Sequence, residues 1–283
     1  MVAFIGMGLL GSNFVKALLK KGEEVQVWNR TASRAVAMEE FGAKAFHNVA
    51  DAVKNADRIH ITLKDDDAVN DVLAVAQAGF KPGVLIIDHT TTSAHGAAER
   101  TAAWKSKGFT YLHAPVFMGP SNALDSTGSM LVSGDQELIA QVEPILATMT
   151  GKVINFGEKV NAAAGMKLIG NLFLIAMTAG VADSLMLAKA LDIDSADVSR
   201  LFESWNPSAM LPARLKKITS QTFDQPTWEL NMARKDARLM MEEAAFKDAK
   251  LIAIPAIAAE MDRLIKDGYG ASDWTVIGKA AVS

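Results

Sequence analysis

Short apolar runs alternate with amphipathic stretches through the first half of the chain. The runs predict strands at 2–5, 24–28, 58–62, 84–88, 110–116, 129–133 and 152–156. Helix-capping residues such as Thr31 and Ser93 precede stretches of helical spacing at 35–41 and 97–107. This alternation predicts an α/β fold with a doubly wound parallel sheet and helices on both faces.

The second half follows a different pattern. Residues 161–191 lack proline and repeat apolar positions at helical spacing, which predicts a single helix of about 45 Å. Further helices are predicted at 196–203, 212–220, 228–247 and 254–267. We therefore expect two domains, 1–158 with the sheet and 159–283 all-helical, joined by the long helix.

A glycine-rich turn follows the first predicted strand. Its sequence is Gly6-Met7-Gly8-Leu9-Leu10-Gly11, and a helical pattern begins directly after it. This strand, turn and helix start at βαβ spacing are typical of a Rossmann-type dinucleotide site, where the helix N-terminus faces a pyrophosphate. The alternative is a purely structural connection between strand and helix.

The end of the second strand discriminates between the two nicotinamide cofactors. An acidic residue there would bind a ribose 2′-hydroxyl, but the chain has Asn29-Arg30-Thr31. A guanidinium with two small hydrogen-bonding side chains suits a 2′-phosphate, which favours NADP over NAD. Alternatively, Arg30 is a solvated surface charge.

Composition excludes several classes of function. The formal net charge of −3 gives no basic footprint for nucleic acid, the absence of cysteine excludes thiolate metal sites, and the five histidines form no metal-spaced pair. Met1-Val2-Ala3 lacks a basic leader, so we expect a cytoplasmic protein. The apolar stretch 172–182 is interrupted by Asp183 and is shorter than the ~20 residues that span a membrane, so no membrane partner is expected.

A candidate proton donor lies in the long helix. Lys167 and Asn171 are four residues apart, so both lie on one helical face within reach of one small substrate. Reduction of a carbonyl requires an acid near its oxygen, and a desolvated lysine has a pKa lowered towards a useful range. The alternative is an ordinary exposed lysine.

The chain resembles the β-hydroxyacid dehydrogenase family, which includes 3-hydroxyisobutyrate dehydrogenase and the glyoxylate/succinic semialdehyde reductases. The resemblance rests on the glycine turn, on Trp28-Asn29-Arg30-Thr31, on Asp88-His89-Thr90-Thr91-Thr92, on Ala114-Pro115-Val116 and on Lys167-Leu168-Ile169-Gly170-Asn171. It implies that Lys167 is the catalytic acid/base and that Asn171 orients it or the substrate. It further implies cofactor contacts from Leu63, Lys64, Thr91 and Lys235, the last in a Lys235-Asp236 pair.

The chain also departs from the family pattern. Relatives read Ser-Gly after Pro-Val in the substrate loop, where this chain has Phe117-Met118-Gly119, and Gly170 replaces an asparagine of the family's K-x-x-N-N. The loss of a hydroxyl and the gain of apolar bulk predict a substrate less polar than a semialdehyde acid, held by Phe117, Met118, Gly119, Asn122 and Asn171. Alternatively, Phe117 and Met118 are core residues.

These observations favour an NADPH-dependent oxidoreductase acting on a small aldehyde, ketone or β-hydroxyacid. Two alternatives are an imine reductase, which usually carries Asp or Tyr where Lys167 stands, and a non-catalytic cofactor-binding protein. The family's helical domain forms dimers or tetramers through its long helix, so a homo-oligomer is expected.

Overall fold

Two compact units make up the chain. The computed structural model describes residues 1–282, and these divide into Met1–Asn171 and a second unit that begins at Leu172. The division falls inside helix α8 (Ala162–Ala190), whereas the predicted boundary at 158/159 lies at the turn before it. The first turn of α8 belongs to the first unit because Ala163 is buried there and its N–H donates to Ser133 Oγ at 2.9 Å.

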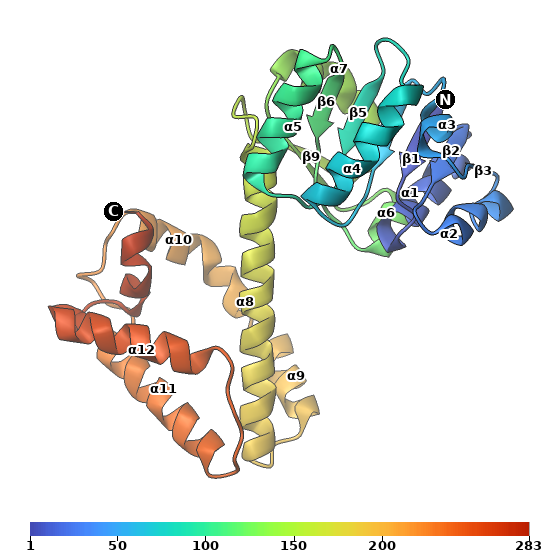
Figure 1. Cartoon of the computed structure of the whole chain (residues 1–283). Coiled ribbons are helices and arrows are strands. Elements are labelled where there is room, and N and C mark those ends of the chain that lie inside the picture. Colours follow the sequence, from blue (N-terminus) through green and yellow to red (C-terminus); the bar gives the residue numbers. More distant parts are fainter. Residues whose placement is uncertain (283) are drawn as a thin grey trace. The chain divides into compact units, whose positions relative to one another are not determined.

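A six-stranded parallel sheet forms the centre of the first unit (Figure 1). Its order is β3-β2-β1-β4-β5-β6, which confirms the predicted doubly wound topology. The strands are β1 (Val2–Ile5), β2 (Val25–Trp28), β3 (Lys44–Ala45), β4 (Arg58–Ile61), β5 (Leu85–Asp88) and β6 (Thr110–His113). The short strand β3 was not predicted.

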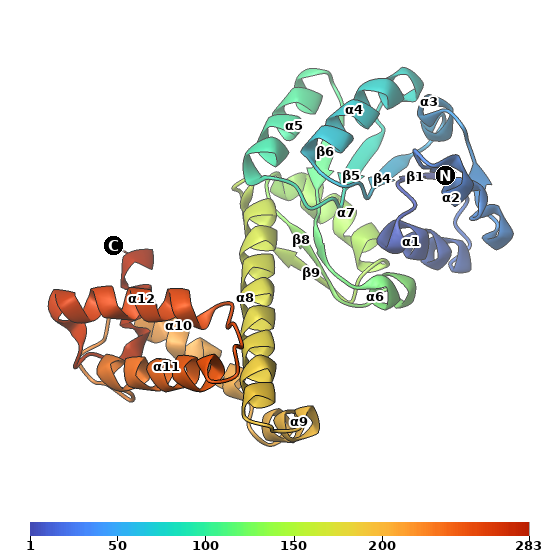
Figure 2. The same ribbon diagram turned by 60° about the horizontal axis from the view of Figure 1, so that its bottom comes forward.

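Successive residues of β1 point to opposite faces of the sheet, and each face has its own core. Val2 and Phe4 pack in a cluster with α1 (Leu9–Lys20), α6 (Pro120–Asp125) and α7 (Gln136–Ala147). Ala3 and Ile5 pack in a second cluster with α3 (Val49–Val53), α4 (Asp66–Ala76) and α5 (Ala94–Ser106) (Figures 1 and 2). Because both faces are covered, the central strand β1 is apolar throughout.

A second, three-stranded sheet follows β6. It contains β7 (Val116–Phe117), β8 (Ser129–Val132) and β9 (Lys152–Asn155), and β7 runs antiparallel to β8. The single strand predicted at 110–116 is therefore wrong. Pro115 separates β6 from β7 because it has no N–H to continue a ladder, although its carbonyl still accepts from Leu131.

The second unit is helical over its residues 172–282, as predicted, apart from an isolated β-bridge between Glu229 and Asp273. Besides the remainder of α8, it comprises α9 (Ser195–Ser204), α10 (Leu211–Thr219), α11 (Leu230–Ala245) and α12 (Ile254–Leu264), followed by helical turns at Ile265–Tyr269 and Trp274–Ala281. A small core of Phe223, Leu230, Met261, Leu264 and Val276 holds α11 and α12 together.

Helix α8 is apolar almost all round. Most of its large apolar side chains between Met166 and Leu185 are exposed, among them Leu172 and Ile175. With a mean hydropathy of 1.6, it is long and apolar enough to cross a membrane, judged by length and composition alone. The sequence prediction, which considered only 172–182, did not anticipate this property of the whole helix.

Candidate active site

The glycine turn between β1 and α1 has steric reasons for glycine at two positions, Gly6 and Gly11, and leaves open space at Gly8. Gly6 has φ +99°, and a Cβ there would lie 2.0 Å from the carbonyl oxygen of Thr62. At Gly11 a Cβ would lie 1.9 Å from the Gly6 oxygen, so the helix packs closely against the strand end. Gly8 has open space around it and lines a cleft. A ligand can therefore approach the backbone where α1 begins, as a pyrophosphate requires.

A cleft of about 620 Å³ lies beside this turn. It is lined by Gly6 and Gly8, by the end of β2 with Asn29, Arg30 and Thr31, and by Leu63 and Lys64 after β4. The predicted cofactor residues of the first unit thus come together, apart from Met7, Leu9, Leu10, Gly11 and Thr91, which are not among its lining residues. Arg34 also lines the cleft, and sequence reasoning missed it, although its i, i+4 spacing from Arg30 was a signal.

The polar residues after β2 have different roles. Asn29 Oδ1 accepts from the Met7 N–H at 2.9 Å, and its amide donates to the Thr31 carbonyl. Asn29 therefore ties the end of β2 to the glycine turn. Arg30 and Arg34 are exposed and form no ion pair within residues 1–282. Both guanidinium groups are free to meet an anion.

A buried network of hydrogen bonds fixes the loop of Leu63, which lines the cleft. The carboxylate of Asp88 accepts from the Thr90 N–H at 2.9 Å and from the Tyr111 hydroxyl at 2.6 Å. Thr90 Oγ1 in turn accepts from the Leu63 N–H at 3.0 Å. Arg100 donates to Tyr111, and burial raises the pKa of that phenol well above its usual range. The Asp88 motif therefore fixes the loop of Leu63, while Thr91 is exposed beyond it.

Two histidines lie against each other inside the sheet. His89 Nδ1 lies 2.7 Å from the Ala114 carbonyl oxygen and must donate to it, so the neutral ring accepts through Nε2 from His60 Nδ1 at 2.9 Å. His60 Nε2 is then a buried acceptor without a partner among residues 1–282. Burial lowers the pKa of His89 to about 4 and that of His60 well below its usual value. Both rings are neutral at physiological pH.

Lys167 and Asn171 occupy successive turns of α8. Neither side chain forms a hydrogen bond or ion pair within residues 1–282, and both are partly buried. Burial lowers the pKa of Lys167 below its usual value. The helix thus presents an ammonium and a carboxamide, one turn apart, that form no hydrogen bond or ion pair with the described chain.

The two apolar residues of the substrate loop, Phe117 and Met118, have different surroundings. Met118 packs against the core cluster beneath α1, as the core alternative predicts. The partly buried ring of Phe117 points elsewhere: its centroid lies 4.3 Å from Lys167 Nζ, and its edge lies against Gly170. Phe117 is therefore next to the candidate acid, and Met118 supports the loop from below.

Asn122 is already engaged inside this loop. Its Oδ1 accepts from the Gly119 N–H at 2.9 Å, and its amide donates to Thr127 Oγ1 at 3.0 Å. Asn122 therefore holds the loop closed at Gly119, and its direct contact with a substrate stays a prediction. In the second unit, Lys235 on α11 forms an ion pair of 2.7 Å with Asp236 and is exposed.

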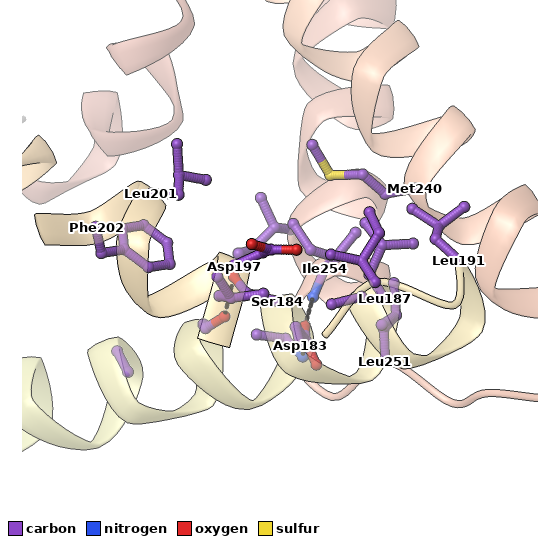
Figure 3. A pocket seen from close by; sticks show the side chains of 17 residues that line it. Asp183, Ser184, Leu187, Leu191, Asp197, Leu201, Phe202, Met240, Leu251 and Ile254 are labelled. Carbon is purple, nitrogen blue, oxygen red and sulfur yellow. Dashed lines mark hydrogen bonds between the residues drawn. The ribbon is translucent and has the colours of Figure 1, made fainter. Parts of the chain in front are cut away.

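The helical unit contains a separate apolar cavity of about 490 Å³ (Figure 3). Leu187, Leu201, Phe202, Met240 and Ile254 are among the side chains that line it. Asp183 of α8 lies at its edge, where the carboxylate accepts from the N–H groups of Ile252, Ala253 and Ile254. Asp183 thereby caps the start of α12, and these backbone hydrogen bonds hold its pKa below the usual value despite burial.

Comparisons with known proteins show the family of the chain. The NAD binding domain of 6-phosphogluconate dehydrogenase matches residues 1–157. The chain is 27% identical over 293 residues to 3-sulfolactaldehyde reductase of Escherichia coli (strain K12), covering 98% of this chain and 94% of that protein. It is also 27% identical over 280 residues to the chloroplastic glyoxylate/succinic semialdehyde reductase 2 of Arabidopsis thaliana, covering 96% and 76%.

Among solved structures, an imine reductase from Myxococcus stipitatus in complex with NADP+ superposes with a TM-score of 0.91 over 98% of each chain, at 21% identity. A likeness at this identity concerns the fold alone. The family match, by contrast, covers more than half of the chain and begins with the glycine turn. The chain therefore belongs to the family of the 6-phosphogluconate dehydrogenase NAD-binding domain, and it is a β-hydroxyacid dehydrogenase-like oxidoreductase that binds a nicotinamide cofactor.

Proposed function

We propose that this protein is an NADPH-dependent reductase of small aldehydes or ketones whose substituents are uncharged, with Lys167 as the proton donor. One observation carries the proposal. Lys167 and Asn171 are free of partners on one face of α8, in the same compact unit as the cleft at the glycine turn. A charged group left without a partner at a half-buried position is available for chemistry.

The preference for NADPH rests on charge at the end of β2. Arg30 and Arg34 line the cleft without ion-pair partners, and no acidic residue occupies the position where one would bind a ribose diol. Two guanidinium groups suit a phosphate dianion. Several solved structures of this fold are complexes with NADP+ or NADPH, which supports the same preference.

The proposed mechanism divides the reaction between cofactor and protein. The bound nicotinamide supplies the hydride. The Lys167 ammonium donates a hydrogen bond to the substrate oxygen and gives up a proton as charge develops there. Asn171, one turn further along α8, donates its amide to the same substrate and fixes its orientation. Because burial lowers the pKa of Lys167, less free energy is needed to release this proton.

The substrate class follows from the ring beside Lys167. Phe117 offers no hydrogen-bond donor, and the amide of Asn122 is already bonded to Thr127. A carboxylate next to the carbonyl would therefore be desolvated against an aromatic ring, which is unfavourable. An uncharged alkyl or aryl group would gain about 25 cal/mol per Å² of buried apolar surface.

A homo-oligomer assembled through α8 is part of the proposal. The exposed apolar part of this helix, from Met166 to Leu185, is about 30 Å long, which is close to the core thickness of a bilayer. However, it is interrupted by the polar residues Lys167, Asn171 and Asp183. A second copy of this chain suits such a surface better than lipid, in keeping with a cytoplasmic protein. A substitution such as Leu172→Glu should dissociate the oligomer, as measured by sedimentation velocity.

The test is NADPH oxidation with a panel of uncharged aldehydes, semialdehyde acids and cyclic imines, using the parent protein and Lys167→Met. We expect turnover with the uncharged aldehydes, and a loss of two to four orders of magnitude in Lys167→Met with cofactor binding intact. Turnover with imines alone would support the imine reductase alternative. No turnover with any substrate would support a non-catalytic cofactor-binding protein.

A further inference from the structure

The ring of Phe117 and the glycine at position 170 meet in space although 53 positions separate them. A Cβ built at Gly170 would lie 2.3 Å from Phe117 Cζ and 2.9 Å from Cε1, far inside van der Waals contact. Nothing comparable surrounds Gly165 on the same helix, where a Cβ would meet no atom within 4 Å. The ring can lie against α8 only because residue 170 has no side chain.

The same ring lies against the Lys167 ammonium. Lys167 Nζ lies 4.3 Å from the ring centroid, and the side chain has no hydrogen bond or ion pair within residues 1–282. A cation over an aromatic face is attracted by the negative charge of the ring surface. Phe117 therefore acts on both the position of the ammonium and its charged state.

Resting on the function proposed above, we infer that Phe117 and Gly170 form one positioning and specificity unit. The absence of a side chain at 170 admits the ring, the ring holds the Lys167 ammonium towards the substrate, and the same ring excludes a substrate carboxylate. Two of the positions at which the chain departs from its family's pattern, 117 and 170, are thus a single compensated change. Phe117 and Gly170 act through Lys167 and do not themselves transfer protons.

The positioning role is tested by moving the ring in two ways. Phe117→Leu removes the aromatic face but keeps apolar bulk, whereas Gly170→Ala keeps the ring but displaces it. The ring lies 4.3 Å from the Lys167 ammonium, and burial, not a neighbouring charge, lowers the pKa of Lys167. Either variant should therefore shift the basic limb of the pH profile of kcat/KM to lower pH by about half a unit. The double variant should show no further shift.

Two matched variants serve as controls in the same assay. Gly165→Ala adds a methyl group to the same helix in open space, and Phe117→Tyr restores an aromatic face; both should keep the parental pH profile. A parental profile in Phe117→Leu and Gly170→Ala would overturn the positioning role. So would an equal shift in Gly165→Ala.

Specificity is tested with the ratio of kcat/KM for succinic semialdehyde to that for butanal. Phe117→Ser combined with Gly170→Asn should raise this ratio at least tenfold above the parent, because a charge-assisted donor replaces the ring. Gly170→Asn alone should not raise it, since the displaced ring at position 117 still offers no hydrogen-bond donor to a carboxylate. A ratio in the double variant equal to the product of the two single effects would overturn the coupling.

A thermal measurement tests the contact independently of activity. Alanine for glycine inside a helix normally stabilises, so Gly165→Ala should raise the Tm. Gly170→Ala should raise it only when Phe117 is also replaced by Ala. An equal rise for both glycines in the parent would overturn the contact. Retained turnover in Lys167→Met would instead overturn the proposed function and the positioning role, while this thermal cycle would still decide the contact.

Discussion

Acidification should destabilise the sheet unit well before its carboxylates titrate. His89 and His60 are buried in contact with each other, with His89 donating to the Ala114 carbonyl and accepting from His60. Protonation of His89 would turn its Nε2 into a donor, although His60 Nδ1 needs an acceptor at that position. It would also place a charge at a fully buried position, which desolvation disfavours. The native state therefore resists protonation of this pair.

The magnitude follows from the displaced pKa. His89 titrates near 6.5 when unfolded and at about 4 when folded. Between these values the unfolded state binds more protons, so the free energy of unfolding falls as pH falls, by about 1.4 kcal/mol per pH unit. From pH 7.5 to 4.5 the loss due to His89 is about 2.5 kcal/mol. His60, whose pKa is also lowered, adds to this loss. Above about pH 7.5 both histidines are neutral in the folded and the unfolded state, so they contribute almost no pH dependence there.

Urea unfolding at pH 7.5, 6.5, 5.5 and 4.5, followed by tryptophan fluorescence, measures this loss. His89→Gln keeps an amide donor for the Ala114 carbonyl but cannot titrate, so its stability should fall less steeply with acid. His95→Ala is the matched control because His95 is exposed, and it should retain the parental slope. Carboxylates such as Asp57, with a pKa of about 2, act only at lower pH. A flat free energy of unfolding from pH 6.5 to 4.5 in the parent would refute the reasoning.

Three further predictions concern the cleft and the helical unit. Arg30→Ala should weaken NADPH binding by about 1.5–3 kcal/mol and leave NADH binding nearly unchanged, as measured by calorimetry; equal parental affinities would contradict it. Thr90→Val leaves the Leu63 N–H without its acceptor and should weaken either cofactor by about 1 kcal/mol, with an unchanged Tm arguing that the loop, not the fold, is affected. Asp183→Asn replaces a carboxylate that accepts three N–H groups and should destabilise by about 1–3 kcal/mol in urea unfolding; unchanged stability would show that water replaces the cap.

Local features of the site were predictable because residue types encode them directly. Gly6 needs a positive φ and Gly11 a close approach, and no other residue type meets both requirements without strain. The end of β2 was predictable for the same reason, since the topology places that residue beside the glycine turn. Arg34 was not predicted as a cleft residue because a charged residue in the first turn of a helix normally faces solvent.

Contacts between distant segments could not be predicted. The sequence marks Phe117 and Gly170 separately as departures from a pattern, but nothing in the local pattern indicates that a ring fills the space left by a missing side chain. The His60–His89 pair is similar. Each residue alone is typical of a neutral core histidine, and their tautomers are decided only when β4 and β5 become neighbours and the Ala114 carbonyl fixes one ring.

Two charged residues interrupt the apolar surface of α8, and a hydropathy pattern treats them alike. The structure distinguishes them by what surrounds each charge. Asp183 is 4% exposed and accepts three backbone N–H groups, so its charge is neutralised by the start of another helix and serves the fold. Lys167 has only an aromatic ring beside it, and burial lowers its pKa without any compensating anion. A buried charge with a full set of hydrogen-bond partners, such as Asp183, costs little stability and is held in place. A half-buried charge without such partners, such as Lys167, costs stability. It is retained only where it interacts with a ligand, which the folded chain does not itself supply.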